Sequence, residues 1–190
     1  MVSQIMNERN DSKKILLGIT GGIAVYKSCE LVRQLVGKGY EVHVVMTKAA
    51  TQFVTPLTFQ ALSHNAVRTE LFSLTEESEM GHIHLADFPD LILIAPTTAD
   101  FIARVAHGFC DDLLTTLLSV TRKPVWMAPA MNVHMYEHPP TQKNIKTLQE
   151  IGYQILGPAS GSLACGYEGL GRMEEPATVV DAVEKFFKKN

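Results

Sequence analysis

Short apolar runs alternate along this chain with longer stretches in which apolar residues recur at helical spacing. The runs show no regular polar alternation, which is typical of strands buried on both faces of a parallel sheet. We therefore expect strands at 15–19, 42–46, 91–95, 125–128 and 153–156. Helices are expected at 23–37, 56–63, up to 106, 111–120, 141–151 and 175–188, the last with Pro176 in its first turn.

Strands separated by helices form right-handed βαβ units and a parallel sheet. The pattern therefore predicts an α/β fold, a single doubly wound parallel-sheet domain of Rossmann-like or flavodoxin-like type, over residues 14–190. Residues 1–13 are polar and are expected to form a frayed lead-in. Residues 73–81 and 157–173 are expected to be loops, the second flexible because it is rich in glycine.

Composition narrows the class of protein. A chain of 190 residues with 46% hydrophobic residues is long enough for one domain with a sizeable core. Charged residues make up 19% and the net charge is −3, which argues against a basic nucleic-acid surface. No apolar stretch approaches the length of a membrane span, and residues 1–13 lack the apolar block of a signal peptide. We therefore expect a cytoplasmic protein with no nucleic-acid and no membrane partner.

The three cysteines lie far apart, which fits neither a disulfide framework nor a CxxC metal site. Cys29 and Cys110 lie in or beside apolar helical segments and are expected to be packing residues. Cys165 lies in a segment with four glycines and with Arg172, whose charge could lower the pKa of a thiol. Such a segment suits a lid that delivers a proton after closing, and the alternative is an ordinary loop cysteine.

Four predicted strands end in small or polar residues, and ligands of doubly wound folds bind beyond the carboxyl ends of the strands. These strand ends are 20–22, 47–48, 96–100 and 129–132. Their joint change of character predicts a binding site at this edge of the sheet. Asn132 closes the fourth strand, where a neutral amide could hold a carboxylate or simply form a turn.

The first strand runs into Gly18-Ile-Thr-Gly-Gly22, directly before a predicted helix. Glycines there let the backbone approach a phosphate, and the helix N-terminus offers unpaired N–H groups. Thr20 breaks the GxGxxG pattern, no GK[ST] follows, and the second strand ends in Thr47-Lys48 without an acid for an adenosine ribose. A mononucleotide or another phosphate is therefore favoured over NAD, and the alternative is a tight turn without a ligand.

Two groups of histidines could carry chemistry. His82 and His84 lie on one face if their segment is extended. They could then form a metal-binding pair, provide one catalytic imidazole, or be two surface histidines. Residues 134–138 match the H-x-x-E-H signature of inverted zinc proteases, which requires a helix through both histidines. Pro139 disfavours helix at His138, so we expect no metal site there.

Five segments in this order resemble one family: GITGGIAVYK (18–27), MGHIHL (80–85), APTTAD (95–100), APAMN (128–132) and ACGYEGLGRM (164–173). The chain resembles the homo-oligomeric flavin-containing cysteine decarboxylases from Lys14 to about Lys188. The resemblance implies FMN and the decarboxylation of 4′-phospho-N-pantothenoylcysteine to 4′-phosphopantetheine in coenzyme A biosynthesis. It also implies sites shared between the subunits of a trimer, with trimers able to assemble further, up to a dodecamer.

The resemblance assigns roles to residues of this chain. His82 would be the catalytic histidine, Asn132 would hold the substrate carboxylate, and Cys165 would be the proton donor of the final reduction. Lys27 and Met135 are further candidates for substrate contacts. The residues implied to bind FMN are Gly21, Gly22 and Ile23 at the phosphate and Thr47, Thr98, Ala99, Asp100, Phe101 and Ala130 around the rest of the flavin.

These groups suit the implied chemistry. A cysteinyl carboxylate has no electron sink, and oxidation of the side chain to a thioaldehyde by the flavin supplies one. After CO₂ leaves, a proton from a thiol and the returned hydride give the saturated product. Three alternatives remain: an oxidative decarboxylase of peptidyl C-terminal cysteine, as in lantibiotic maturation, a flavin prenyltransferase and a non-catalytic flavin-binding regulatory subunit.

Overall fold

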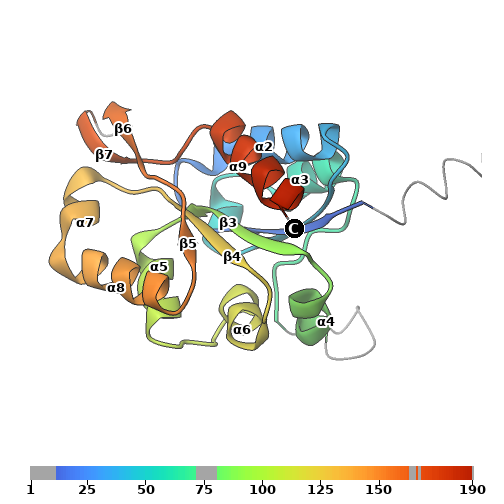
Figure 1. Cartoon of the computed structure of the whole chain (residues 1–190), viewed down its shortest axis with the longest axis horizontal. Helices are drawn as coiled ribbons and strands as arrows, with labels where there is room; N and C mark the ends of the chain where they lie inside the picture. Colours follow the sequence, from blue (N-terminus) through green and yellow to red (C-terminus); the bar gives the residue numbers. More distant parts are fainter. Residues whose placement is uncertain (1–11, 72–80, 163–165, 167, 190) are drawn as a thin grey trace, which may run out of the picture.

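A parallel sheet of five strands forms the centre of the molecule in the computed structural model, which describes residues 12–71, 81–162, 166 and 168–189 (Figure 1). The strand order is β2-β1-β3-β4-β5, and every neighbouring pair is parallel. Its strands are β1 (Lys14–Ile19), β2 (Glu41–Met46), β3 (Leu91–Thr97), β4 (Val125–Pro129) and β5 (Gln154–Ile155). The predicted α/β fold with a doubly wound sheet is confirmed.

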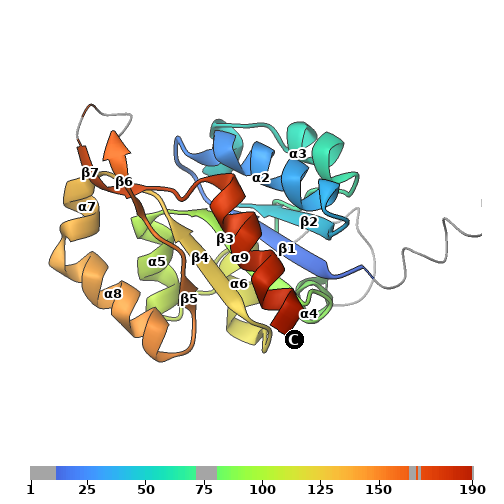
Figure 2. The same ribbon diagram turned by 45° about the horizontal axis from the view of Figure 1, so that its top comes forward.

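Helices cover both faces of the sheet, as Figures 1 and 2 show. One face carries α2 (Val25–Gly37), α3 (Pro56–Ser63) and α9 (Pro176–Lys189). The other carries α4 (Gly81–Asp87), α5 (Ala99–Ala106), α6 (Leu113–Val120) and α8 (Pro139–Glu150). Successive side chains of β1 alternate between the two cores, because Leu17 packs with α2 and Leu16 packs with α6.

Gly18 shows why the first strand needs a residue without a side chain. A Cβ at this position would lie 2.6 Å from Ile94 Cδ1 and 2.7 Å from Leu114 Cδ1. The Leu114 side chain of α6 therefore occupies the space above Gly18, and α6 lies directly against β1 at that level. This packing places the end of the first strand directly beneath α6.

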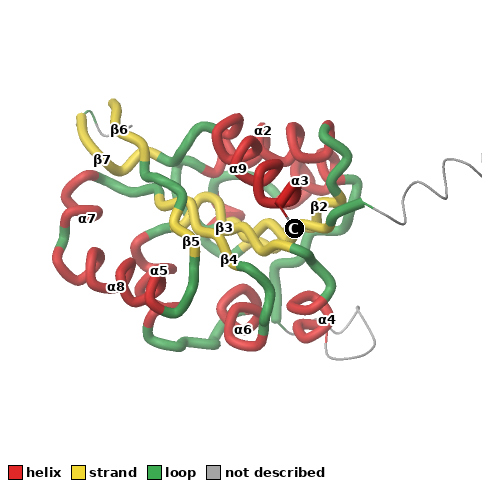
Figure 3. The backbone as a smooth tube through the Cα atoms, in the orientation of Figure 1, coloured by secondary structure: helices red, strands yellow, loops and turns green. Residues whose placement is uncertain are grey.

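The glycine-rich segment differs from its predicted flexible loop. It forms an antiparallel pair, β6 (Ala159–Ser162) and β7 (Glu168–Arg172), which stands beyond the edge of the main sheet (Figure 3). The glycines serve close packing: a Cβ at Gly169 would lie 2.8 Å from Val133 Cγ2, and one at Gly171 would lie 2.3 Å from the Met131 carbonyl oxygen. The glycine content predicted a flexible backbone, whereas in the structure the glycines allow β7 to pack closely against Val133 and Met131.

Three short elements were also missed. The segment with His82 and His84 is the helix α4 and not extended chain, so the premise of a shared face, which holds for residues i and i+2 of a strand, was wrong. The 3-10 turn η2 (Ala50–Gln52) and the helix α7 (Val133–Glu137) follow β2 and β4. The break predicted at His138 is confirmed, because α7 ends at Glu137 and α8 begins at Pro139.

The remaining predictions on the chain ends and cysteines have mixed outcomes. Most of the lead-in 1–13 lies outside the described residues, and Lys13 already accepts a backbone hydrogen bond from Glu41 N at 3.1 Å. Cys29 packs against the core as expected, and burial raises the pKa of its thiol. Cys110 is exposed, so its assignment as a packing residue was wrong. None of the described helices combines the length and the apolar content that crossing a lipid bilayer requires.

Candidate functional site

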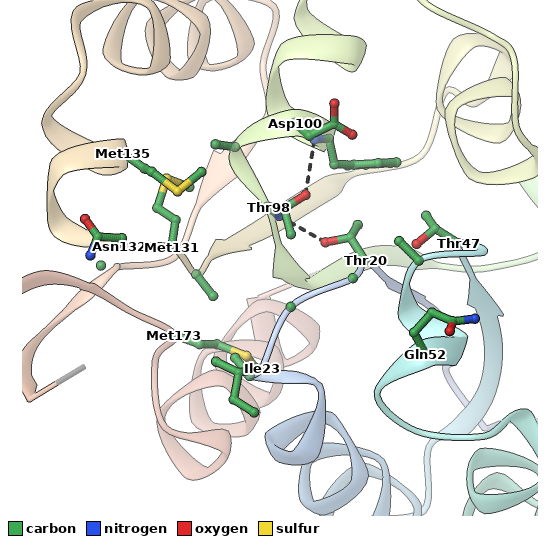
Figure 4. Close-up of a pocket in the computed structure, with 18 of the residues that line it drawn as sticks. Thr20, Ile23, Thr47, Gln52, Thr98, Asp100, Met131, Asn132, Met135 and Met173 are labelled. Carbon is green, nitrogen blue, oxygen red and sulfur yellow. Dashed lines mark hydrogen bonds between the residues drawn. The ribbon is translucent and has the colours of Figure 1, made fainter. Parts of the chain in front are cut away.

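A cavity of about 1280 Å³ lies at the carboxyl ends of β1 to β4 (Figure 4). The turn before α2, the segment after β2, the start of α5, the loop after β4 and the end of β7 contribute its walls. Twelve residues predicted for the site line it together: Gly21, Gly22, Ile23, Lys27, Thr47, Thr98, Ala99, Asp100, Phe101, Ala130, Asn132 and Met135. The predicted convergence of the four strand ends is therefore present in the structure.

Thr20 joins two of these strand ends. Its side chain is buried, and Oγ1 donates to the Pro96 carbonyl at 2.9 Å. The same Oγ1 accepts from Thr98 N at 3.0 Å (Figure 4). Ala130 N donates to the Thr97 carbonyl at 2.9 Å, and this hydrogen bond connects the end of β4 to the end of β3. In the sequence, Thr20 was only the residue that breaks a glycine motif, because its partners lie 76 and 78 residues away.

The glycine turn before α2 has the shape of an anion cradle. A Cβ at Gly21 would lie 2.5 Å from Ala49 Cβ, so only glycine lets this turn pack against the segment after β2. No side chain caps α2, and its first turn has no acidic residue. The positive end of a 13-residue helix therefore lies at the cavity without a side-chain acceptor, which suits a phosphate.

The start of α5 forms a second wall. Thr98 caps this helix, because its Oγ1 accepts from Phe101 N at 3.2 Å. Asp100 is exposed in the first turn, whereas the ring of Phe101 packs in the core with 2% of its surface exposed. The residues of this segment that are predicted to contact the flavin therefore lie at the start of a helix whose first turn is held by the Thr98 cap.

Asn132 and Met135 come from the loop and short helix after β4. Asn132 caps α7, since its Oδ1 accepts from His134 N at 2.8 Å. The neighbouring Met131 N donates to the Gly171 carbonyl at 2.9 Å. The loop that carries Asn132 is thus held by its own cap on one side and by β7 on the other.

Two clusters of charged residues at the cavity were not predicted. The Lys27 ammonium donates to Glu175 Oε1 at 3.0 Å, and this hydrogen bond holds the pKa of Glu175 below its ordinary value. Arg104 bonds Asp111 and lies 3.6 Å from Asp112, and the Asp111 carboxylate raises the pKa of the guanidinium. No sequence signal pairs Lys27 with Glu175, because 148 residues separate them.

Two predicted catalytic residues are not placed in the cavity. Cys165 lies outside the described residues. His82 belongs to α4, whose backbone packs beside α6, and no side chain of α4 from Ile83 to Asp87 lines the cavity. Within the described chain, no group of three or more His, Cys, Asp or Glu side chains could hold a metal ion.

A family model named Flavoprotein matches residues 3–188. This chain belongs to the Flavoprotein family. The chain is 50% identical over 183 residues to the coenzyme A biosynthesis bifunctional protein CoaBC of Bacillus subtilis (strain 168), covering 96% of this chain. It spans 44% of the length of that relative.

Several solved structures have a fold similar to that of this chain. A mutant PPC decarboxylase complexed with pantothenoylaminoethenethiol superposes with a TM-score of 0.82 at 29% identity, covering 93% of this chain and 99% of that chain. The FMN binding protein AtHal3 superposes with a TM-score of 0.81 at 29% identity, covering 94% and 98%. The resemblance to flavin-containing decarboxylases that the five sequence segments indicated is confirmed.

Proposed function

We propose that this chain binds FMN and decarboxylates 4′-phospho-N-pantothenoylcysteine to 4′-phosphopantetheine in coenzyme A biosynthesis. The observation that carries the proposal is the convergence of the four strand ends on one cavity in a Flavoprotein chain. The names of the relative from Bacillus subtilis and of the PPC decarboxylase structure support the substrate.

The residues of the cavity fit FMN. The glycine turn and the uncapped start of α2 would hold its phosphate, and Thr47, Thr98 and Ala130 would frame the rest of the molecule. When bound, FMN supplies the chemistry of accepting a hydride from the cysteinyl side chain and returning it to the decarboxylated product. A cavity of about 1280 Å³ can take both the cofactor and a substrate.

Asn132 would orient the substrate carboxylate. Its Oδ1 accepts from His134 N in the cap of α7, and an amide nitrogen is a neutral donor that suits an anion. A neutral donor holds the carboxylate without stabilising its negative charge as a lysine would. This choice favours loss of CO₂, because charge leaves the carboxylate in the transition state.

His82 and Cys165 complete the proposed machinery. His82 would manage the thiol proton or developing charge in the first step, and Cys165 would donate a proton in the last one. We propose that His82 acts in the site of a neighbouring subunit, since none of the described side chains of α4 lines the cavity of its own chain.

A homo-oligomer, a trimer or an assembly of trimers, accommodates the exposed apolar side chains at the cavity. Ile23, Tyr26 and Met135 line the cavity and are 62%, 60% and 50% exposed. Burial of such side chains against another copy of the chain would be favourable. A cytoplasmic location stays a prediction.

Anaerobic incubation with 4′-phospho-N-pantothenoylcysteine tests the proposal. The purified chain is expected to retain FMN, seen by its absorbance, and to form a product with the mass of 4′-phosphopantetheine. A product two hydrogens lighter would instead indicate an oxidative decarboxylase that lacks the reducing step. A chain that retains no FMN after reconstitution would contradict the proposal.

Two variants test the proposed roles. Cys165→Ser is expected to release the lighter enethiol, because the proton for the final reduction is missing. His82→Asn is expected to keep the yellow colour and to lose turnover by about 10²- to 10⁴-fold. Full yield of 4′-phosphopantetheine by either variant would show that the role was given to the wrong residue.

A further inference from the structure

One wall of the cavity carries two cations that share a single carboxylate. The Lys27 side chain is 5% exposed, and its ammonium donates to the Met173 carbonyl at 2.8 Å and to Glu175 Oε1 at 3.0 Å. Arg172 Nη2 lies 2.8 Å from the same Oε1. The three side chains together carry a net charge of +1 when all are ionised.

Both cations of this cluster belong to residues in the wall of the cavity. Lys27 and Arg172 line it, whereas Glu175, which joins them, is not among the lining residues. The Arg104 guanidinium, on another wall, is neutralised by Asp111 and Asp112. Among the described residues, the Lys27–Arg172 wall is thus where two neighbouring cations meet the cavity with only one acid between them.

We propose that Glu175 is a positioning residue that holds Lys27 and Arg172 as a pair, and that this pair binds the phosphate monoester of the substrate. The inference rests on the proposed function, because it concerns the substrate of that reaction. It adds a subsite to the cavity and names the group that the subsite recognises.

The chemistry of the reaction assigns the pair to the phosphate and not to the carboxylate. A cation beside the carboxylate would stabilise the substrate more than the transition state, in which charge leaves that group. The phosphate keeps its charge throughout, so cations there bind substrate and transition state equally. Arg172 can also present two parallel donors to phosphate oxygens, which a lysine cannot.

Glu175 is needed because the Lys27 ammonium is buried. Without a carboxylate partner, the charge of a buried ammonium is uncompensated, and two adjacent cations repel each other. The Glu175→Gln substitution keeps the size of the side chain and removes the charge. It is therefore expected to weaken the phosphate subsite although Glu175 does not touch the ligand.

The chain offers a matched control. Lys38 Nζ lies 3.1 Å from Glu184 Oε1, and this ion pair also joins α2 to α9. Neither residue lines the cavity. Glu184→Gln therefore removes one ion pair between the same two helices without altering the proposed subsite.

The test titrates FMN-loaded protein with 4′-phosphopantetheine and with pantetheine by calorimetry. The unsubstituted chain is expected to prefer the phosphorylated ligand, and Glu175→Gln and Arg172→Gln to reduce that preference about tenfold. Glu184→Gln is expected to keep the preference, and all variants are expected to retain FMN. In turnover, Glu175→Gln should raise KM about tenfold with kcat within about threefold, the signature of lost uniform binding.

Three results would overturn the inference. Glu175→Gln could keep or increase the phosphate preference, in which case the acid does not position the cations. It could release FMN, in which case the cluster holds the cofactor. Lys48→Gln could abolish the preference while Glu175→Gln does not, which would move the subsite to the end of β2. If the unsubstituted chain neither retains FMN nor decarboxylates the substrate, the proposed function fails and not this inference alone.

Discussion

At Gly171 the backbone of β7 comes so close to the loop carrying Asn132 that a methyl group has no space. A Cβ there would lie 2.3 Å from the Met131 carbonyl oxygen, and φ is 147°, which L side chains rarely adopt. The position therefore couples a glycine of the hairpin to the loop that forms part of the cavity wall. Two backbone segments in contact cannot move apart as easily as a flexible side chain can rotate away.

Gly171→Ala is expected to lower the free energy of unfolding by about 2–4 kcal/mol, through overpacking and backbone strain together. Urea unfolding measures the change. Gly37→Ala is the control, because a Cβ there meets nothing within 4 Å and the residue is helical. It should be neutral or stabilise by up to about 1 kcal/mol. Equal stability of both variants would contradict the close docking of β7.

Thr20 offers a second test at this scale, since its buried hydroxyl serves two strand ends. Thr20→Val keeps the shape and leaves Thr98 N and the Pro96 carbonyl without this partner, at a cost of about 1–3 kcal/mol. FMN affinity should fall with it, because Thr98 lines the cavity. Thr20→Ser restores the hydroxyl and should recover stability and cofactor retention. A valine variant as stable as the unsubstituted protein would contradict the role assigned to the hydroxyl.

At the scale of elements, α2 and α9 are joined by ion pairs at both ends of their contact, through Glu175 and through Glu184. The hydrogen bond from Lys27 lowers the pKa of Glu175 from its ordinary value of 4.5. A carboxyl whose pKa is lower in the folded state stabilises the fold fully above its unfolded pKa. That stabilisation is lost as the pH falls through the folded value.

Unsubstituted protein should therefore unfold at a higher temperature than Glu175→Gln above pH 4.5, and the difference should shrink below it. The difference at neutral pH is expected to be on the order of 1 kcal/mol, because Glu175 is half exposed and solvent screens its charge. Thermal unfolding of both proteins at a series of pH values measures it. A difference that grows on acidification would reverse the assigned sign.

At the scale of the whole molecule, the cavity and α4 lie on different parts of one chain. If His82 acts in the cavity of a neighbour, each active site takes His82 from one subunit and Asn132 from the next. The exposed apolar residues at the cavity rim supply a reason for the subunits to associate.

Co-expression of His82→Asn and Asn132→Gln subunits tests this arrangement. Each variant alone should be inactive, whereas random mixing should restore roughly a quarter of the sites, because each site then draws its two residues from different subunits. Turnover per bound FMN measures the recovery, and sedimentation reports the assembly. Co-expressed subunits without activity would place both residues in one chain.

The apolar pattern was enough to predict the central strands, the longer helices between them and the edge of the sheet that carries the site, whereas the short helices α4 and α7 were missed. Local apolar pattern decides which segments are buried strands, and the carboxyl ends of parallel strands necessarily meet. The bond from Thr20 to Pro96, the docking of Gly171 on Met131 and the pairing of Lys27 with Glu175 were decided only by the tertiary structure. Each joins residues distant along the chain, and a polar or glycine residue carries no local signal of the partner that folding brings to it.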